Sequence, residues 1–175
     1  MSKEFQRWNN ITGWIVFAIS LFVYLMTVEP TASFWDCGEF ILCSYRLEVG
    51  HPPGAPLFLM ISKMFSLMAG SDTSHVAVWI NRFSALGSAF TILFLFWSIT
   101  RLIRMVSKHL EDPRGAASVA ILASGVVGAL AYAFCDTFWF SAVEGEVYAT
   151  SSLFTALVFW AILIWYDEAD KLHAD

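Results

Sequence analysis

The chain has 175 residues, of which 58% are hydrophobic and only 14% are charged, and its formal net charge is −5. Because soluble domains carry about a quarter charged residues, this composition excludes an ordinary soluble protein and indicates an integral membrane protein. The acidic balance also argues against nucleic acid as a partner.

Four apolar segments are long enough to cross a bilayer, which takes roughly 20 residues. They contain no Lys, Arg, Asp, Glu or His, and they cover residues 11–28, 83–100, 115–135 and 147–166. We therefore predict an all-α membrane protein in which residues 1–175 form a single polytopic module. In the third segment, small residues at four-residue spacing predict the face that packs on other helices. They are Ala116, Ala120, Ser124 and Gly128.

A fifth apolar run, residues 55–69, is short and has Lys63 near its centre. A charge at mid-bilayer costs about 2.5–3.5 kcal/mol. If this run spanned the membrane, the basic N-terminus and the basic loop of residues 101–114 would lie on opposite sides. Since basic segments collect in the cytoplasm, we predict that residues 55–69 form an interfacial amphipathic helix instead.

This choice fixes the predicted topology. The N-terminus is cytoplasmic, and residues 29–80 form a long outer loop with interfacial helices over 35–47 and 55–69. The acidic residues then gather on the outer side, in this loop and in the turn before the last span.

Two carboxylates of the outer loop, Asp36 and Glu39, lie three residues apart in the stretch "FWDCGEF". If residues 35–47 are helical, both side chains share one face, with Arg46 near the far end. A carboxylate at a membrane surface can take a proton from a hydroxyl group, and a cation can offset a leaving phosphate. The pattern fits transfer from a lipid-linked donor, and it equally fits solvated acids that favour a helix start.

The stretch "GHPPGAP", residues 50–56, predicts a rigid corner. Its prolines fix φ, and His51 is held extended because a proline follows it. Such a corner directs His51 back toward the acidic helix, although a lone His in a turn is also an ordinary hydrogen-bonded side chain.

The second outer turn, "CDTFWFSAVEGEVYA", places Glu144 and Glu146 at the start of the last span. Residues two apart on a helix do not share a face, so at most one of them is expected to point into a site. Both also suit a helix N-terminus, where the dipole favours acids.

Three stretches resemble a family of bacterial membrane proteins, the domain-of-unknown-function 2723 family, which has an animal relative that acts as a protein O-mannosyltransferase. They are "PTASFWDCGEFILCSYRLEVGHPPGAPLF", "INRFSALGSAF" and "SAVEGEVYA". The family pattern of D-[SC]-G-E followed by H-P-P-G is present here as residues 36–39 and 51–54. The family is similar to GT-C glycosyltransferases, so the resemblance implies the N-terminal half of a GT-C fold. Because GT-C enzymes have more spans than this chain, it is expected to be an N-terminal fragment or to have a partner subunit.

The resemblance also implies roles for individual residues. Asp36 is the expected general base toward a Ser or Thr hydroxyl, and Glu39 is the expected neighbouring catalytic acid. The residues implied in substrate binding are His51, Arg46, Glu144, Glu146 and Tyr148.

The implied reaction moves a sugar from a polyprenyl-phosphate donor to a protein hydroxyl on the extracytoplasmic side. Its partners are membrane lipid, the lipid-linked sugar and an acceptor protein, and no nucleic acid. The sequence requires no cofactor, and no His-rich ligand set supports a metal, although a divalent metal stays an alternative. The expected location is the bacterial inner membrane, with residues 29–80 in the periplasm.

A hypothesis with a different kind of function remains open. The chain could be a non-catalytic membrane subunit, or a fragment of a transporter or complex, whose outer acids are only solvated. Spans free of ionisable residues argue against transport, because transporters place such residues near the bilayer centre.

Overall fold

The computed structural model describes residues 3–52, 54–107 and 115–172, and this part of the chain is helical without strands. The α-helices are α1 (Lys3–Thr27), α2 (Cys37–Arg46), α3 (Pro56–Ser66), α4 (Val76–Val106), α5 (Ala116–Ala133), α6 (Asp136–Val143) and α7 (Val147–Leu172). Two 3-10 turns, η1 (Leu67–Ala69) and η2 (Thr73–His75), connect α3 to α4. Four helices, α1, α4, α5 and α7, are long and apolar enough to cross a membrane, which confirms the predicted fold class.

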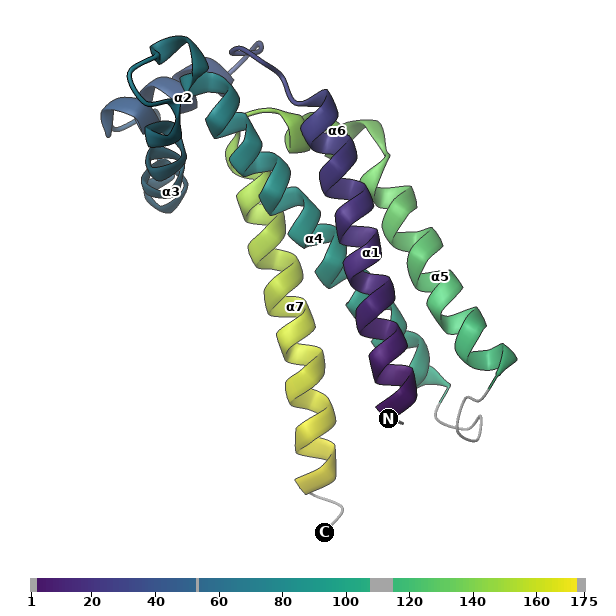
Figure 1. Ribbon diagram of the computed structural model, residues 1–175. Helices are drawn as coiled ribbons and strands as arrows, with labels where there is room; N and C mark the ends of the chain where they lie inside the picture. Colours follow the sequence, from purple (N-terminus) through teal and green to yellow (C-terminus); the bar gives the residue numbers. More distant parts are fainter. Residues whose placement is uncertain (1–2, 53, 108–114, 173–175) are drawn as a thin grey trace.

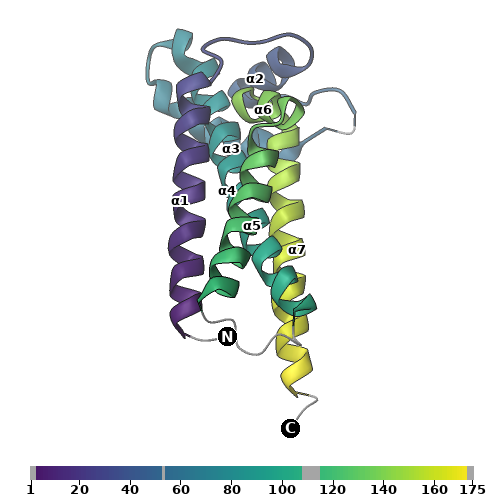
Figure 2. The same cartoon turned by 90° about the vertical axis from the view of Figure 1, so that its right-hand side faces the viewer.

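The four long helices form a bundle with two different ends (Figures 1 and 2). The N-terminus of α1 and the C-terminus of α7 lie at one end, which we call the terminal end. Helices α2, α3 and α6 lie at the other end, which we call the acidic end. The chain therefore runs up α1, down α4, up α5 and down α7, and residues 55–69 do not add a fifth crossing.

Several helices extend beyond the apolar segments that the sequence defines. Helix α4 begins at Val76 and ends at Val106, so Arg101 and Arg104 are helical rather than part of a loop. A helix can continue past the hydrocarbon core because long basic side chains reach the interface. The other basic residues of the predicted loop, Lys108 and Arg114, lie outside the described residues.

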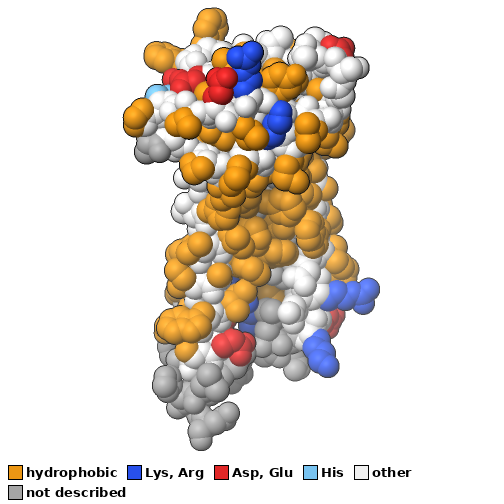
Figure 3. All heavy atoms as spheres, turned by 90° about the vertical axis from the view of Figure 1, so that its left-hand side faces the viewer, with side chains coloured by type: hydrophobic (Ala, Val, Ile, Leu, Met, Phe, Trp, Pro, Cys, Tyr) orange, Lys and Arg blue, Asp and Glu red, His pale blue; other side chains and the backbone are white. Residues whose placement is uncertain are grey.

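Charged side chains are confined to the two ends of the bundle on the face that Figure 3 shows, and hydrophobic side chains cover the middle. This pattern is expected where lipid tails surround the helices. Exposed apolar side chains continue onto α3, where Leu57, Met60 and Met64 are all exposed. Helix α3 thus pairs a buried face with an exposed apolar one, as an interfacial helix does.

The predicted interfacial helices correspond to α2 and to α3 with η1. Lys63, the charge at the centre of the fifth apolar run, donates a hydrogen bond to the backbone carbonyl of Tyr45 in the last turn of α2. Its ammonium group also lies 4.7 Å from the centroid of the Tyr45 ring. Lys63 therefore satisfies one of the unpaired carbonyls at the end of α2 and joins the two short helices.

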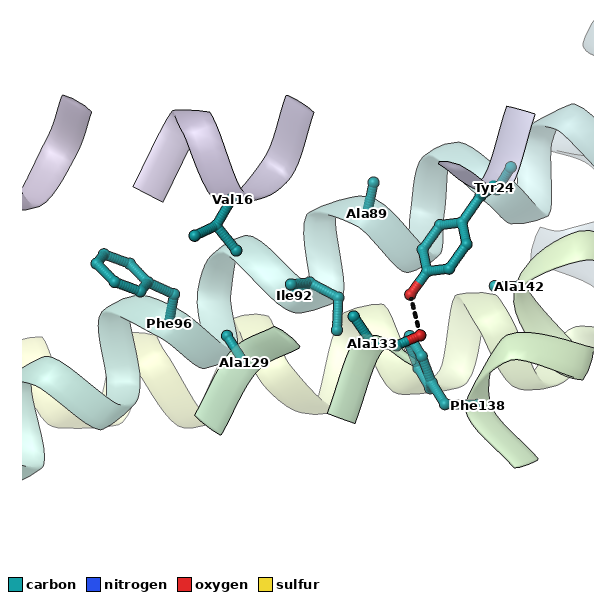
Figure 4. Packing of buried hydrophobic residues seen from close by; sticks show 10 residues of the cluster. Val16, Tyr24, Ala89, Ile92, Phe96, Ala129, Ala133, Phe138 and Ala142 are labelled. Atoms are coloured by element: carbon teal, nitrogen blue, oxygen red, sulfur yellow. Dashed lines mark hydrogen bonds between the residues drawn. The ribbon is translucent and has the colours of Figure 1, made fainter. Parts of the chain in front are cut away.

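A core at the centre of the bundle joins α1, α4, α5 and α6 (Figure 4). The hydroxyl group of Tyr24 is buried there and donates a 2.8 Å hydrogen bond to the backbone carbonyl of Ala133 at the end of α5. Phe138 of α6 packs beside it, with ring centroids 6.4 Å apart. Helix α6 was not predicted, and this contact anchors it over the end of the core.

The packing face of α5 differs from the prediction. Ala116, Ala120 and Ser124 are exposed, and Gly128 is only partly buried. The buried face is one residue further along, at Ile121, Gly125, Ala129 and Ala133. Gly125 allows the close approach, because a Cβ there would lie 2.6 Å from Cγ2 of Thr100 on α4. The prediction was wrong because both faces of α5 carry small residues, so spacing alone does not separate them.

Candidate active site

The site begins where α2 starts. Asp36 occupies the N-cap position of α2, yet its side chain makes no capping hydrogen bond. Trp35, just before it, has a positive φ of 66° and is 94% exposed. Asp36 therefore stands exposed at the acidic end of the bundle with its carboxylate uncommitted to the helix.

Glu39, one turn into α2, holds the loop that follows this helix. Its Oε1 accepts a 2.7 Å hydrogen bond from the backbone N–H of His51, and its Oε2 lies 3.0 Å from Nδ1 of the same residue. The backbone and side-chain hydrogen bonds from His51 lower the pKa of Glu39. The side-chain hydrogen bond and the charge of Glu39 raise the pKa of His51. The prolyl corner thus turns His51 back toward the acidic helix, as predicted.

Gly50 makes this close approach of the loop possible. A Cβ at this position would lie 3.0 Å from Oε1 of Glu39 and 3.7 Å from Sγ of Cys43. A side chain here would press on the carboxylate that accepts the hydrogen bonds, so glycine avoids a tight contact with Glu39.

The turn between α6 and α7 brings a further acid to the same region. Burial, followed by the charges of Glu144 and Asp36, raises the pKa of Glu146. Gly145 between the two glutamates is buried, and a Cβ there would lie 3.3 Å from Cγ1 of Ile41 on α2. The turn therefore packs on α2, and Glu146 lies close enough to Asp36 for their charges to interact.

Asn81 on α4 connects these segments, and sequence reasoning did not single it out. Its side chain is fully buried, and its Nδ2 donates to the backbone carbonyls of Glu29 at 2.7 Å and Thr31 at 2.9 Å. Its Oδ1 lies 2.8 Å from the position of a Cβ on Gly145. Asn81 thus fixes the segment that leads into Asp36 and contacts the turn that carries Glu146. One feature of the sequence could have pointed to Asn81: it is an amide side chain near the start of an apolar helix.

Two of the predicted substrate-binding residues lie apart from this group. Arg46 is at the opposite end of α2 from Asp36, and its guanidinium is 3.6 Å from the carboxylate of Glu48. Tyr148 is in the first turn of α7 with 59% of its side chain exposed. Their predicted roles depend on a substrate that reaches beyond the carboxylates.

Asp36, Glu39 and His51 also form a group with the composition of a metal site. One ligand atom from each residue lies within 4.8 Å of the other two. The sequence offered no His-rich set in support of a metal, but the fold brings one histidine to two carboxylates that lie 12 to 15 residues earlier.

Comparison with known proteins identifies the family. The model of the Protein O-mannosyl-transferase TMEM260 N-terminal domain matches residues 36–175. The chain belongs to this family. The match begins at Asp36 and covers every predicted site residue. Besides Asp36 and Glu39, these are His51, Arg46, Glu144, Glu146 and Tyr148.

Two curated relatives of the TMEM260 family are similar to most of the chain. Protein O-mannosyl-transferase tmem260 of Dictyostelium discoideum is 26% identical over 152 residues, which are 87% of this chain and 16% of that protein. Protein O-mannosyl-transferase TMEM260 of Mus musculus is 28% identical over 154 residues, which are 88% of this chain and 19% of that protein. The chain thus spans less than a fifth of either relative, and the predicted resemblance to O-mannosyltransferases is confirmed. No solved structure matches the chain significantly.

Proposed function

We propose that this chain is the acid-bearing N-terminal module of a membrane glycosyltransferase of the GT-C type. It would move a sugar from a polyprenyl-phosphate donor to a Ser or Thr hydroxyl of a protein on the extracytoplasmic side. The proposal is supported by the family membership and by one observation, the exposed carboxylate of Asp36 beside Glu39 and His51 at one end of the bundle.

The reaction assigns Asp36 the role of general base. Its carboxylate takes the proton of the acceptor hydroxyl as the hydroxyl oxygen attacks the anomeric carbon of the sugar. The bond between this carbon and the phosphate oxygen breaks, and the polyprenyl phosphate leaves with the electron pair. Mannose is the first sugar to test, since both curated relatives are named as O-mannosyl-transferases.

Asp36 suits this role better than its neighbour Glu39. The carboxylate of Glu39 already accepts two hydrogen bonds from His51, and these lower its basicity. The Asp36 side chain makes no hydrogen bond to the start of α2. Glu39 is therefore assigned the positioning of His51, and Asp36 the proton transfer.

The substitution Asp36→Asn in the native host, at the normal locus, tests the reaction. Glycopeptide mass spectrometry of envelope proteins should show loss of the glycans while immunoblotting shows the protein still in the membrane. Asp72→Asn is the matched control, because Asp72 is another exposed acid of this end and, among the described residues, its side chain bonds its neighbours Ser74 and His75. Unchanged glycans in Asp36→Asn would favour the alternative of a non-catalytic subunit.

The sidedness of the site needs its own test. We expect the acidic end to face the periplasm of the bacterial inner membrane, because the basic residues Lys3, Arg7, Arg101 and Arg104 belong to the terminal end. A single cysteine at Ser71, in the turn between α3 and α4, should react with an impermeant maleimide from outside intact cells. Labelling only after permeabilisation would place the acidic end in the cytoplasm.

A further inference from the structure

We propose that Asp36, Glu39 and His51 bind a divalent cation, for which Mn²⁺ is the best match. This inference rests on the proposed function, because the cation would face the phosphate of the donor. It adds to that function a metal dependence that the sequence did not support.

The geometry of the three side chains suits a small cation. Oε2 of Glu39 and Nδ1 of His51 are 3.0 Å apart. Two adjacent ligands at about 2.1–2.2 Å from a metal are separated by about 3.0 Å, and opposite ligands by about 4.3 Å. A carboxylate oxygen of Asp36 lies within 4.8 Å of a ligand atom of each of the other two residues, and its exposed side chain has room to turn toward a bound cation.

The loop keeps its shape when the cation binds. Oε1 of Glu39 accepts the backbone N–H of His51 at 2.7 Å, so this oxygen holds the loop while Oε2 remains for the metal. A cation would take the place of the proton between Oε2 and the imidazole. The second oxygen of Asp36 stays available for the acceptor hydroxyl.

The carboxylates around the site outnumber the basic side chains available to neutralise them. Asp36, Glu39 and Glu146 bring three carboxylates together, with Glu144 close by. The basic residues of this end that the structure describes all have other partners. Arg46 faces Glu48, Lys63 bonds the carbonyl of Tyr45, and Arg82 stacks 4.5 Å from the Trp79 ring.

The ligand types select the metal class. Carboxylate oxygens suit Mg²⁺, Ca²⁺ and Mn²⁺, whereas imidazole suits the transition metals. Two oxygens with one nitrogen favour Mn²⁺, which accepts both. Three protein ligands leave coordination positions for donor phosphate oxygens, where the cation would stabilise the leaving charge.

Mn²⁺ binding to the full native polypeptide, purified in an uncharged detergent, tests the site. Electron paramagnetic resonance measures free Mn²⁺ by its six-line signal, so it needs neither donor nor acceptor. We expect one saturable site, and an at least tenfold weaker affinity in Glu39→Gln and in His51→Gln, by analogy with losses of about 10–100-fold at metal sites. Glu48→Gln, an exposed acid of the same loop, should bind as the unchanged protein does.

The two proposals fail in different ways. Absence of saturable binding below about 1 mM, or equal binding in the Glu39 and His51 variants, overturns the cation site. Asp36→Asn must also bind Mn²⁺ more weakly, and because Asp36 is exposed this variant keeps the test valid if another variant misfolds. Saturable Mn²⁺ binding that all three variants weaken, together with unchanged glycans in Asp36→Asn, would instead overturn the transferase role and leave the cation site standing.

Discussion

The side-chain amide of Asn81 donates a 2.7 Å hydrogen bond to the backbone carbonyl of Glu29, across 52 residues of sequence. A second bond to the carbonyl of Thr31 makes Asn81 a clamp on the segment between α1 and α2. The backbone N–H of Glu29 in turn donates to the carbonyl of Val143 at the end of α6. Asn81 and this backbone hydrogen bond together tie the segment that leads into Asp36 to α4 and to the end of α6.

Asn81→Ala should lower the free energy of unfolding by about 1 kcal/mol, because two part-buried hydrogen bonds to backbone carbonyls are lost. The measurement is reversible unfolding in sodium dodecyl sulfate followed by circular dichroism. Ser88→Ala is the control on the same helix, since Ser88 is fully buried and its hydroxyl has no partner within the described segments. Equal unfolding free energies in the two variants would show that the Asn81 hydrogen bonds do not contribute to stability.

Gly125→Val should separate α5 from α4 and cost about 1–3 kcal/mol by overpacking. The added side chain meets Cγ2 of Thr100 and the ring of Phe96, which lie 2.6 Å and 2.9 Å from a Cβ at this position. Ala120→Val on the exposed face of the same helix should be nearly neutral. The same unfolding assay decides which face of α5 packs on α4. A larger loss of unfolding free energy in Ala120→Val than in Gly125→Val would support the face predicted from sequence.

Lys63→Met should loosen the joint between α2 and α3 while leaving the long helices intact. The variant loses the hydrogen bond to the carbonyl of Tyr45 and the contact with its ring. Hydrogen exchange read by mass spectrometry should quicken in the last turn of α2. Arg46→Met removes only an exposed pair with Glu48 and should leave exchange unchanged. Equal rates in both variants would contradict a role for Lys63 as the cap of α2.

Glu146→Gln should stabilise the protein at neutral pH. The pKa of Glu146 is raised above its ordinary value of 4.5 by burial and by two neighbouring acids, so the folded state favours the protonated form. Ionisation therefore costs stability as pH rises past 4.5 through the folded-state pKa, and glutamine avoids this cost. The melting temperature of the variant should exceed that of the unchanged protein at pH 7 and equal it below pH 4.5.

Asp72→Ala provides a control of opposite sign for this pH series. Hydrogen bonds from Ser74 lower the pKa of Asp72, so its carboxylate stabilises the folded state above its ordinary pKa and loses this effect as pH falls. The variant should melt earlier than the unchanged protein at neutral pH, and the difference should shrink in acid. Matching shifts in both variants would point to a general effect of net charge.

Sequence alone determined the class of the protein and singled out the residues of the candidate site. Transfer from water to lipid depends on the local composition of each segment, so the four spanning helices could be read directly. For the same reason, the charge of Lys63 predicted that residues 55–69 do not span the membrane, and the helix they form is too short to be one of the four candidate spans. Asp36 and Glu39 share a helix, and the prolyl corner places His51 beside them, so this part of the site was also local enough to predict.

Only the tertiary structure decided which faces meet. In a membrane helix both the lipid-facing and the protein-facing sides are apolar, so periodicity could not show that Gly125 rather than Ala120 packs on α4. The approach of Glu146 to Asp36 and the clamp by Asn81 depend on contacts between residues far apart in sequence. Leu47 has the left-handed conformation, so the chain turns back after α2. Glu48 thereby comes within 3.6 Å of Arg46, which pairs with it and not with Asp36 or Glu39.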